Sequence, residues 1–144
     1  MSVNSILVQK SGSIPTISAD ASVRDVLQGL EENDVGALII SDDGTTMRGI
    51  ISERDVVRGL RTMGDEVLDA TVSDLMTTDV ITCSPNDQVA LVRAMMAKHH
   101  IRHIPVLDND RLVGLLSIRD IIQNRLDEIE AEAEVMRGYI SGRY

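Results

Sequence analysis

Two short segments of the chain carry nearly the same residues, and these residue types could hold an anion or a sugar. The segments are GIISERD at positions 49–55 and GLLSIRD at positions 114–120. In each, a serine, an arginine and an aspartate follow an aliphatic run of the kind that forms a buried strand. If a helix begins at the serine, its free amides favour an anion, the arginine can neutralise a phosphate and the aspartate can accept hydrogen bonds from ribose hydroxyls.

The same residues also have a purely structural interpretation as helix caps. In a capping box, Ser52 accepts a hydrogen bond from the amide of Asp55, and the Asp55 carboxylate accepts one from the amide of Ser52. Ser117 and Asp120 can form the second box, and each cap is worth about 1 kcal/mol. Capping explains two of the repeated residue types without a ligand, so the residues alone leave both alternatives open.

The two segments belong to an internal duplication. The hydrophobic pattern of residues 21–40 coincides with that of residues 87–106, and apolar periodicity predicts the order helix, strand, turn, strand, helix in each half. The predicted helices and strands are 22–32, 37–40, 47–51 and 53–60 in the first half, and 87–98, 103–107, 112–116 and 118–126 in the second. The helical spacing predicts one apolar face with Val23, Val26, Leu27 and Leu30 in the first of these helices, and Val56, Val57 and Leu60 on the inward side of the helix 53–60.

These elements predict an α+β (mixed α/β) fold built from two repeats. We place the first repeat at residues 1–66, the second at 67–126 and a C-terminal helical extension at 127–144. A small three-stranded sheet with two helices is hard to bury alone, so we expect each repeat to pack against the other about a pseudo-twofold axis.

Composition argues against several classes of function. The formal net charge of −9 repels a phosphodiester backbone, so we expect no nucleic-acid partner. No signal sequence is visible and no apolar run approaches the roughly 20 residues that a bilayer requires, which predicts a cytoplasmic protein without a membrane segment. The chain has no phosphate loop, nucleophile elbow or dinucleotide-binding glycine pattern, so we expect no enzyme activity.

The chain has one cysteine and three histidines, residue types that can react or bind metal. Cys83 is the only cysteine, so no internal disulfide can form, and we interpret it as a half-buried packing residue. His99, His100 and His103 lie close in sequence, but adjacent residues on a helix end point in different directions and no carboxylate pair completes a metal site. We therefore predict no metal, a cationic helix end, and His103 as a ligand contact.

The pattern as a whole resembles a known family. The paired helix-strand-strand-helix units, the Gly-aliphatic-aliphatic-Ser-x-x-Asp ending of each, and the strand HIPV at 103–106 followed by an acidic turn resemble a tandem of cystathionine-β-synthase-type (CBS) domains, or Bateman module, of the stand-alone bacterial type. The resemblance covers about residues 10–126. It implies an adenosine-containing ligand, such as AMP, ADP, ATP, NAD or S-adenosylmethionine, in the cleft between the repeats, and no catalytic cofactor.

The resemblance also implies which residues form two related sites. In the first, Asp120 would hold a ribose, Ser117 would contact ribose or phosphate and Leu115 would line the adenine. The remaining residues of this site would be Arg119, Arg102, His103, Val35, Gly36, Ile14 and Pro15. The second site would use Asp55, Ser52, Arg54, Ile50, Val80, Ile81 and Ile101.

The two predicted sites differ in charge. Arg102, His103 and Arg119 of the first correspond to Gly36, Ala37 and Arg54 of the second. A phosphate prefers the better neutralised pocket, so we expect the Asp120 site to dominate.

The extension allows two interpretations. It presents the apolar residues Leu126, Ile129, Ala133 and Met136 among acidic neighbours, followed by Tyr139, Ile140 and Tyr144. It could cover its own domain, or it could be an oligomerisation or partner arm. The resemblance implies a disc-like homodimer, which favours the second interpretation.

The sequence therefore predicts a regulatory module for energy sensing. It would bind an adenine nucleotide between its repeats and pass the bound state to an unidentified regulated protein or to its own assembly. The alternative is a ligand-free scaffold or oligomerisation protein of the same fold, in which the repeated segments serve only as helix caps.

Overall fold

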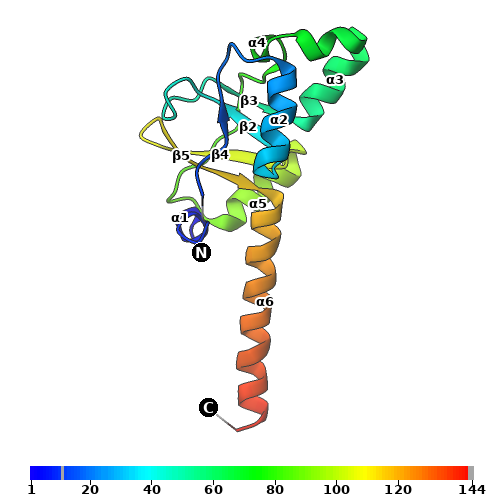
Figure 1. Cartoon of the computed structure of the whole chain (residues 1–144). Helices are drawn as coiled ribbons and strands as arrows, with labels where there is room; N and C mark the ends of the chain where they lie inside the picture. The colour runs from blue at the N-terminus through cyan, green and yellow to red at the C-terminus, as the bar shows by residue number, and fades with distance from the viewer. Residues whose placement is uncertain (11, 143–144) are drawn as a thin grey trace.

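The computed structural model describes residues 1–10 and 12–142, so Tyr144 of the predicted extension lies outside the described residues. The elements are α1 (Val3–Leu7), β1 (Thr16–Ile17), α2 (Val23–Asn33), β2 (Ala37–Ile40), β3 (Gly49–Ser52), α3 (Glu53–Met63), the 3-10 helix η1 (Gly64–Asp69), α4 (Val72–Leu75), α5 (Val89–His99), β4 (His103–Asp108), β5 (Arg111–Ser117) and α6 (Ile118–Ile140). Both halves contain helices and strands, which confirms the predicted mixed α/β class (Figure 1).

The first sheet has the strand order β1-β2-β3. β1 runs parallel to β2, and β2 runs antiparallel to β3 with Ala37 opposite Ser52. All residues of the central strand β2 are buried, because this apolar run is covered on both faces. The register places Ser52, where α3 begins, at the same edge of the sheet as the start of β2.

The second sheet differs from the expectation of three strands. Within the described residues it has two, β4 and β5, which pair antiparallel with His103 opposite Ser117. The segment that corresponds to β1 makes a single parallel bridge, between Cys83 and Val106. Earlier in the same segment, Thr77 bridges to Ile50 of the first sheet, so only the end of the segment reaches β4 and no full third strand forms.

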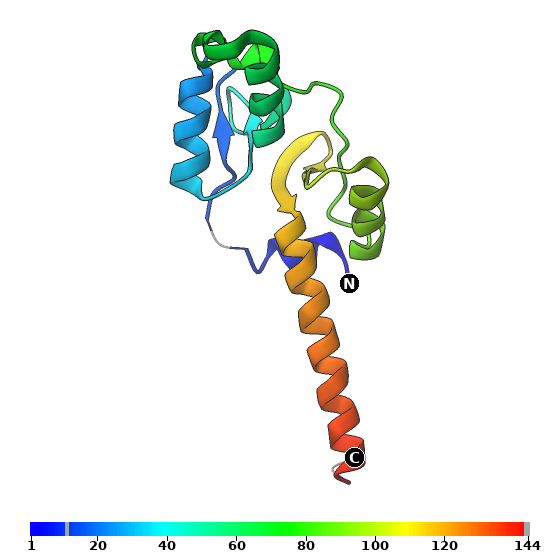
Figure 2. The same cartoon turned by 90° about the vertical axis from the view of Figure 1, so that its right-hand side faces the viewer.

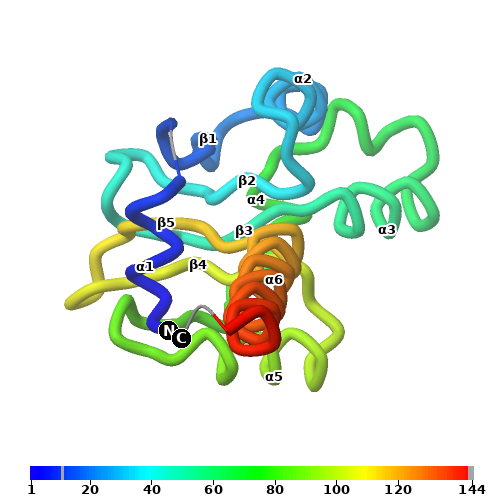
Figure 3. The backbone as a smooth tube through the Cα atoms, turned by 90° about the horizontal axis from the view of Figure 1, so that it is seen from below, coloured from blue at the N-terminus to red at the C-terminus, as the bar shows by residue number. Residues whose placement is uncertain are grey.

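The strands of the two halves lie next to one another in the middle of the molecule, with α2 and α5 on opposite sides (Figure 3). A buried cluster joins the halves: Ile39 of the first sheet packs with Leu112 and Leu115 of the second. The amide of Leu112 also donates to the carbonyl of Thr45 at 2.8 Å. The clefts between the repeats are therefore walled by packed strands from both halves.

In helix α3, Val56 packs against the core as predicted, but Val57 and Leu60, which were also expected to face inward, do not. These side chains are 65% and 51% exposed, and the buried residue of the helix is Gly59. A Cβ at Gly59 would lie 2.6 Å from a methyl of Leu75 and 2.7 Å from one of Val67. The expectation was wrong because α3 approaches its neighbours through the glycine, which leaves the larger apolar side chains on the outer face.

The two ends of the chain lie with the second half. Val3 and Ile6 of α1 are buried in the same cluster as Ile104, and the amide of Val3 donates to the carbonyl of Asp87 at 2.9 Å. At the other end, α6 continues well past the predicted repeat and projects from the body as one helix (Figure 2).

Candidate ligand sites between the repeats

Both repeated segments form the strand-to-helix junction that their sequence predicts. α3 begins directly after Ser52 and α6 directly after Ser117. The amide of Ser52 donates to Asp55 Oδ2 at 2.9 Å, and the amide of Ser117 donates to Asp120 Oδ2 at 2.8 Å. Both capping boxes are formed, so the capping interpretation is confirmed.

Capping does not use all the acceptor capacity of either aspartate. In both boxes the cap bond goes to Oδ2. Among the described residues, Asp55 Oδ1 accepts a single hydrogen bond, of 3.3 Å from Thr77 Oγ1, and lies 3.8 Å from the Arg58 guanidinium. A carboxylate oxygen has two acceptor positions, so a capping aspartate at a pocket wall can also bind hydroxyl donors.

The Asp120 junction opens onto a pocket of ≈ 710 Å³, which we call the Asp120 pocket. The predicted residues that line it are Asp120, Ser117, Arg119, Leu115, Arg102, His103, Val35, Gly36 and Pro15. Ile14 does not line it, because its side chain packs into the buried cluster between the sheets. Lining residues that the sequence did not indicate are Lys10, Leu27, Leu30, Glu31, Asp34, Glu53 and Ile118.

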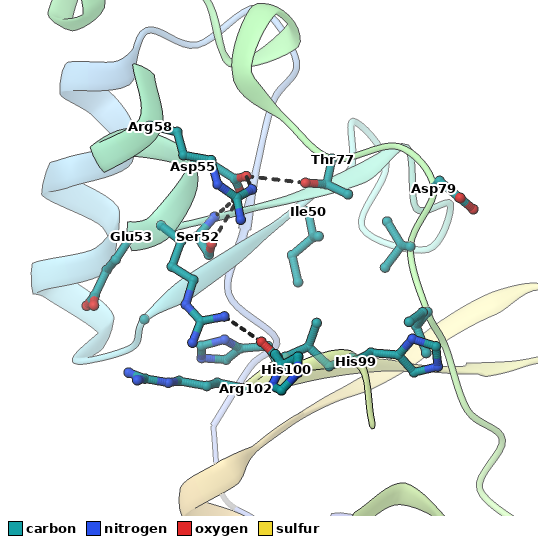
Figure 4. A pocket seen from close by; sticks show the side chains of 16 residues that line it. Ile50, Ser52, Glu53, Asp55, Arg58, Thr77, Asp79, His99, His100 and Arg102 are labelled. Atoms are coloured by element: carbon teal, nitrogen blue, oxygen red, sulfur yellow. Dashed lines mark hydrogen bonds and ion pairs between the residues drawn. The ribbon is translucent and has the colours of Figure 1, made fainter. Parts of the chain in front are cut away.

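The Asp55 junction opens onto a second pocket, of ≈ 290 Å³, which we call the Asp55 pocket (Figure 4). Every residue predicted for the second site lines it: Asp55, Ser52, Arg54, Ile50, Val80, Ile81 and Ile101. The sequence did not assign Arg58, Thr77, Asp79, His99, His100 or Glu53 to it. Arg58 could have been found from helical spacing, since it follows Arg54 by one turn on α3.

The two pockets share a wall formed by Gly36, Glu53, Arg102 and His103. Gly36 allows the His103 ring to come close, because a Cβ there would lie 3.1 Å from its Cε1 atom. The prediction that phosphate prefers the Asp120 site counted Arg102 and His103 for that site alone. That premise is wrong, because both residues line both pockets.

The remaining charges differ between the pockets. The Asp55 pocket has three arginines, Arg54, Arg58 and Arg102, and three carboxylates, Glu53, Asp55 and Asp79. The Asp120 pocket has the cations Lys10, Arg102 and Arg119 and four carboxylates, Glu31, Asp34, Glu53 and Asp120. His99 and His100 line only the Asp55 pocket. The lining charges therefore favour an anion in the Asp55 pocket.

Each of the two capping aspartates is contacted by a residue from the segment that leads into the other repeat. Asp120 of the second repeat is contacted by the segment before β1, and Asp55 of the first repeat by the segment before α5. Lys10, which precedes β1, donates from Nζ to Asp120 Oδ2 at 2.9 Å and to the Leu115 carbonyl at 2.7 Å. Thr77, which enters the second half, makes the corresponding contact with Asp55. The consequence is unequal, because Lys10 forms a 2.9 Å ion pair with Asp120, whereas Thr77 is neutral and the ion pair of Asp55 is the longer, 3.8 Å contact with Arg58.

Arg54 lines the Asp55 pocket and connects α3 to the end of α5. Its Nη1 donates to the carbonyl of His100, the left-handed residue that ends α5. The bond satisfies one of the free carbonyls of that helix end. The guanidinium of Arg54 is thereby tied to the end of α5, while Arg58 is 75% exposed and only loosely paired with Asp55.

The surroundings of His103 at the shared wall favour the neutral form of its ring. Burial lowers the pKa of His103 below its ordinary value of 6.5, and Arg102 acts in the same direction, while the Glu53 carboxylate opposes the shift. A phosphate bound beside the ring would act as Glu53 does and raise the pKa. His103 can therefore gain a proton when an anion binds.

The lone cysteine is buried, and the part of the chain that the structure describes gathers no set of metal-binding side chains. Cys83 is 5% exposed, more deeply buried than expected, and burial raises the pKa of its thiol to about 11. Among residues 1–10 and 12–142, no group of three or more His, Cys, Asp or Glu side chains is placed to hold a metal ion. No helix in the same part of the chain is long and apolar enough to cross a bilayer, and the cytoplasmic location remains a prediction.

The fold and the paired clefts define a module of two α/β repeats in which each half closes the site of the other. A family model for the CBS domain matches residues 7–62 and again residues 72–127. The chain therefore belongs to the CBS-domain family, and it carries two of these domains in tandem.

Solved structures of the family are similar over most of the chain. A CBS-domain containing protein from Agrobacterium tumefaciens is 30% identical with a TM-score of 0.82, covering 87% of this chain and 99% of that chain. A CBS domain protein from Pyrobaculum aerophilum, complexed with AMP, is 28% identical with a TM-score of 0.73, covering 83% and 89%. The CBS domain pair of protein MJ0100, in complex with 5′-methylthioadenosine and S-adenosyl-L-methionine, is 26% identical with a TM-score of 0.77, covering 89% and 98%.

Two curated relatives are longer than this chain. A mitochondrial CBS domain-containing protein from Arabidopsis thaliana is 31% identical over 131 residues, which are 88% of this chain and 64% of that protein. An inosine-5′-monophosphate dehydrogenase from Nitrosopumilus maritimus is 30% identical over 123 residues, which are 81% of this chain and 24% of the enzyme. The chain thus spans less than two thirds of either relative, and in the enzyme the matching region is only part of the chain.

Proposed function

We propose that this protein is a regulatory module that binds an adenosine-containing nucleotide between its CBS repeats and has no catalytic activity of its own. The observation that carries the proposal is the pair of serine-aspartate helix N termini, each opening onto a pocket, with Arg102 and His103 on the wall between them. A helix N terminus and arginine suit phosphate, and a carboxylate suits ribose hydroxyls. The complexes of relatives with AMP and with S-adenosyl-L-methionine support the same class of ligand.

Within this proposal, the Asp55 pocket is the principal nucleotide site. Asp55 accepts the ribose hydroxyls, and the aliphatic side chains Ile50, Val80 and Ile101 enclose the base. The phosphate lies toward Arg58 and the shared wall, where the lining cations are not outnumbered by carboxylates. A ligand regulates only if it binds two conformations unequally, and the shared wall is the place where occupation of one pocket can alter the other.

The test compares three aspartates that make the same cap. Asp25 forms a capping box with Ser22 at the start of α2 but lines neither pocket, so Asp25→Asn is a matched control for Asp55→Asn and Asp120→Asn. Asparagine keeps one carbonyl acceptor for the cap and removes the charge. Binding of AMP, ADP, ATP, NAD and S-adenosylmethionine to each variant is measured by calorimetry and by thermal unfolding.

We expect Asp55→Asn to weaken AMP binding by roughly 10- to 100-fold, since a hydrogen bond to a charged group contributes about 1.5–3 kcal/mol. Asp25→Asn should leave the affinity within about twofold. Equal weakening by Asp55→Asn and Asp120→Asn would contradict the preference for the Asp55 pocket. Failure of every nucleotide to bind at millimolar concentration would contradict the nucleotide-binding function itself.

The second candidate function is a ligand-free scaffold. One observation favours it: the Ser-x-x-Asp sequences at both pockets make the same capping box as Ser22 and Asp25, which line no pocket. The scaffold is supported if no nucleotide binds and all three Asp→Asn variants lower stability equally.

We also propose that the protein works as a homodimer that acts on a regulated protein not yet identified. Exposed apolar side chains support self-association, among them Val57, Leu60 and Met63 on the outer face of α3, which are 65%, 51% and 39% exposed. Large exposed apolar groups gathered on one face are typical of interaction surfaces.

A further inference from the structure

The last helix leaves the body of the molecule after its first turns and continues into solvent (Figures 1 and 2). Ile121 and Asn124 are the buried residues where α6 packs on the body. From Ile129 to Ile140, every described side chain of α6 is exposed, and only the glycine at 138 is buried. A helical stretch of about 12 residues is marginal in water without a partner, so the projecting part needs a surface to pack on.

One face of α6 carries apolar residues at alternating spacings of four and three. They are Ile122, Leu126, Ile129, Ala133, Met136 and Ile140, and we call them the α6 seam. The exposed fractions of its larger side chains are 54% for Ile122 and Leu126, 47% for Ile129, 62% for Met136 and 84% for Ile140. This spacing has the heptad period of 3.5 residues, which keeps one stripe of a helix facing a partner helix. No charged residue interrupts it.

Charged residues flank the seam in an order that complements a parallel copy of itself. Arg125 and Glu132 each precede a seam residue, and Glu130 and Arg137 each follow one. In a parallel pair of helices, the preceding position of one chain faces the following position five residues later in the other. Arg125 would then face Glu130 of the second copy, and Glu132 would face Arg137 of the second copy, so both kinds of contact join opposite charges.

An antiparallel pair with the same seam contacts is disfavoured by charge. Placing Ile129 opposite Ala133 of a reversed copy brings Glu130 near Glu130 and Glu132 near Glu132. Like charges at these flanking positions are destabilising. Within one chain, Arg125 already lies 3.1 Å from Glu128, a partly exposed contact of small energy that does not fix its guanidinium.

We propose that the α6 seam is the surface on which two copies of this chain pair, as a parallel, in-register, two-stranded coiled coil. The inference rests on the homodimer proposed above and specifies its surface and orientation. Each body is attached at the N-terminal end of its α6, so parallel pairing places both bodies side by side at the same end. The outer faces of the pair carry Asp127, Glu128 and Glu134, which stay in solvent.

The first test is disulfide formation by a single introduced cysteine in the full chain. In a parallel in-register pair, Met136 faces Met136 of the second copy, whereas in an antiparallel pair it faces Leu126. Under mild oxidation, most of the Met136→Cys protein should become a covalent dimer, while Glu134→Cys, on the outer face, should remain largely monomeric. The native Cys83 is 5% exposed, so the wild-type protein is the background control. Equal cross-linking of both variants, or none of either, would overturn the parallel seam.

The second test uses the flanking charges and the molecular mass from light scattering. Glu130→Arg places Arg125 against an arginine in two symmetric contacts and should weaken dimerisation about fivefold or more. The double variant Arg125→Glu/Glu130→Arg restores opposite charges and should return the dissociation constant to within about twofold of wild type. A Glu130→Arg variant that dimerises like wild type contradicts the proposed register, and a wild-type mass of four chains contradicts the two-stranded form.

A third variant pair separates this inference from the homodimer itself. Ile129→Glu disrupts the α6 seam, and Val57→Glu disrupts the outer face of α3. If Val57→Glu is monomeric and Ile129→Glu remains a dimer, the homodimer stands and the α6 pairing is wrong. If wild type is a monomer at micromolar concentration, both fail. If Ile129→Glu is monomeric with an unchanged circular dichroism spectrum of its body, the seam is supported.

Discussion

The glycine that opens each repeated segment offers a sharp test of how the two halves are packed. A Cβ at Gly49 would lie 2.7 Å from the carbonyl oxygen of Thr77, whereas a Cβ at Gly114 would lie 2.5 Å from a terminal methyl of Leu7. The second contact is shorter, but its partner is the end of a flexible side chain. The first partner is backbone, held by a pair of hydrogen bonds between Ile50 and Thr77 of 3.0 and 2.8 Å.

These contacts set the expected cost of alanine at each position. In Gly49→Ala the Thr77 backbone must move by several tenths of an ångström, which weakens two hydrogen bonds of about 1 kcal/mol each and adds overpacking. Alanine restricts the unfolded chain more than glycine does, and this effect offsets about 0.4–1 kcal/mol of the destabilisation. The net destabilisation should be about 2 kcal/mol for Gly49→Ala and at most about 1 kcal/mol for Gly114→Ala, where the leucine rotates away.

The assay is urea unfolding followed by circular dichroism, at one fixed protein concentration because self-association shifts the apparent stability. The same samples are titrated with AMP, since Thr77 lines the Asp55 pocket and Gly49→Ala should weaken binding there. Equal destabilisation by the two substitutions would refute the argument that a backbone neighbour costs more than a side-chain neighbour. A Gly49→Ala protein that is destabilised but binds AMP normally would show that the position of Thr77 does not control the pocket.

Four further predictions concern the side chains of Lys10, His103 and Cys83. Lys10→Met should lower the free energy of unfolding by about 0.5–1 kcal/mol, because it removes an ion pair with Asp120 in which the two side chains are 39% and 20% exposed. Salt screens such a pair, so the difference in stability between wild type and Lys10→Met, measured by urea unfolding, should be smaller at high salt. The pKa of His103 is lowered in the folded protein, so its contribution to stability is present above pH 6.5 and is lost as the pH falls below that value. The urea midpoint should therefore drop less steeply on acidification in His103→Gln than in wild type. Identical slopes in the two proteins would contradict the lowered pKa. A nucleotide phosphate at the shared wall should also raise the pKa of His103, so AMP affinity measured by calorimetry should increase from about pH 7.5 to 6 in wild type and not in His103→Gln. Burial and the raised pKa of about 11 protect the Cys83 thiol, so at about pH 8 it should react with a thiol reagent at least a hundredfold more slowly than after unfolding in urea, and fast labelling of the native protein would show that the site opens.

The order of the elements could be predicted because each half repeats a local hydrophobic pattern. Val23, Val26, Leu27 and Leu30 were expected on one apolar face of a helix; Val23, Val26 and Leu30 are buried, and Leu27 is 42% exposed. The same reasoning failed for Val57 and Leu60, because periodicity shows which residues share a face and does not show which face is covered. At α3 the answer depends on how closely Gly59 approaches Val67 and Leu75, and sequence spacing carries no information on that approach.

The residues of the site could be predicted where they are local to a motif and not where they arrive from a distance. Ser52 and Asp55 follow from a four-residue pattern, but Lys10 reaches Asp120 across 110 positions and has no motif to reveal it. Arg102 and His103 show a different limit. Alignment of the two halves assigns each residue to one site, whereas the residues at the start of β4 lie between the pockets and line both.

The duplication gives the chain two equivalent helix N termini, at Ser52 and Ser117. They differ in the residue that contacts the capping aspartate, which comes from the segment leading into the other repeat. At Asp120 the entering segment brings a lysine, whose ammonium takes the carboxylate and the Leu115 carbonyl as partners. At Asp55 it brings a threonine, a neutral donor at 3.3 Å that ribose hydroxyls can replace without separating an ion pair. A ligand entering the Asp120 pocket must share or displace the lysine, and a ligand entering the Asp55 pocket meets a carboxylate whose ion pair is the 3.8 Å contact with the exposed Arg58. The inequality of the two sites therefore follows from two side chains outside the repeated motif, and exchanging them, with Lys10→Thr and Thr77→Lys together, should move the preferred site from Asp55 to Asp120.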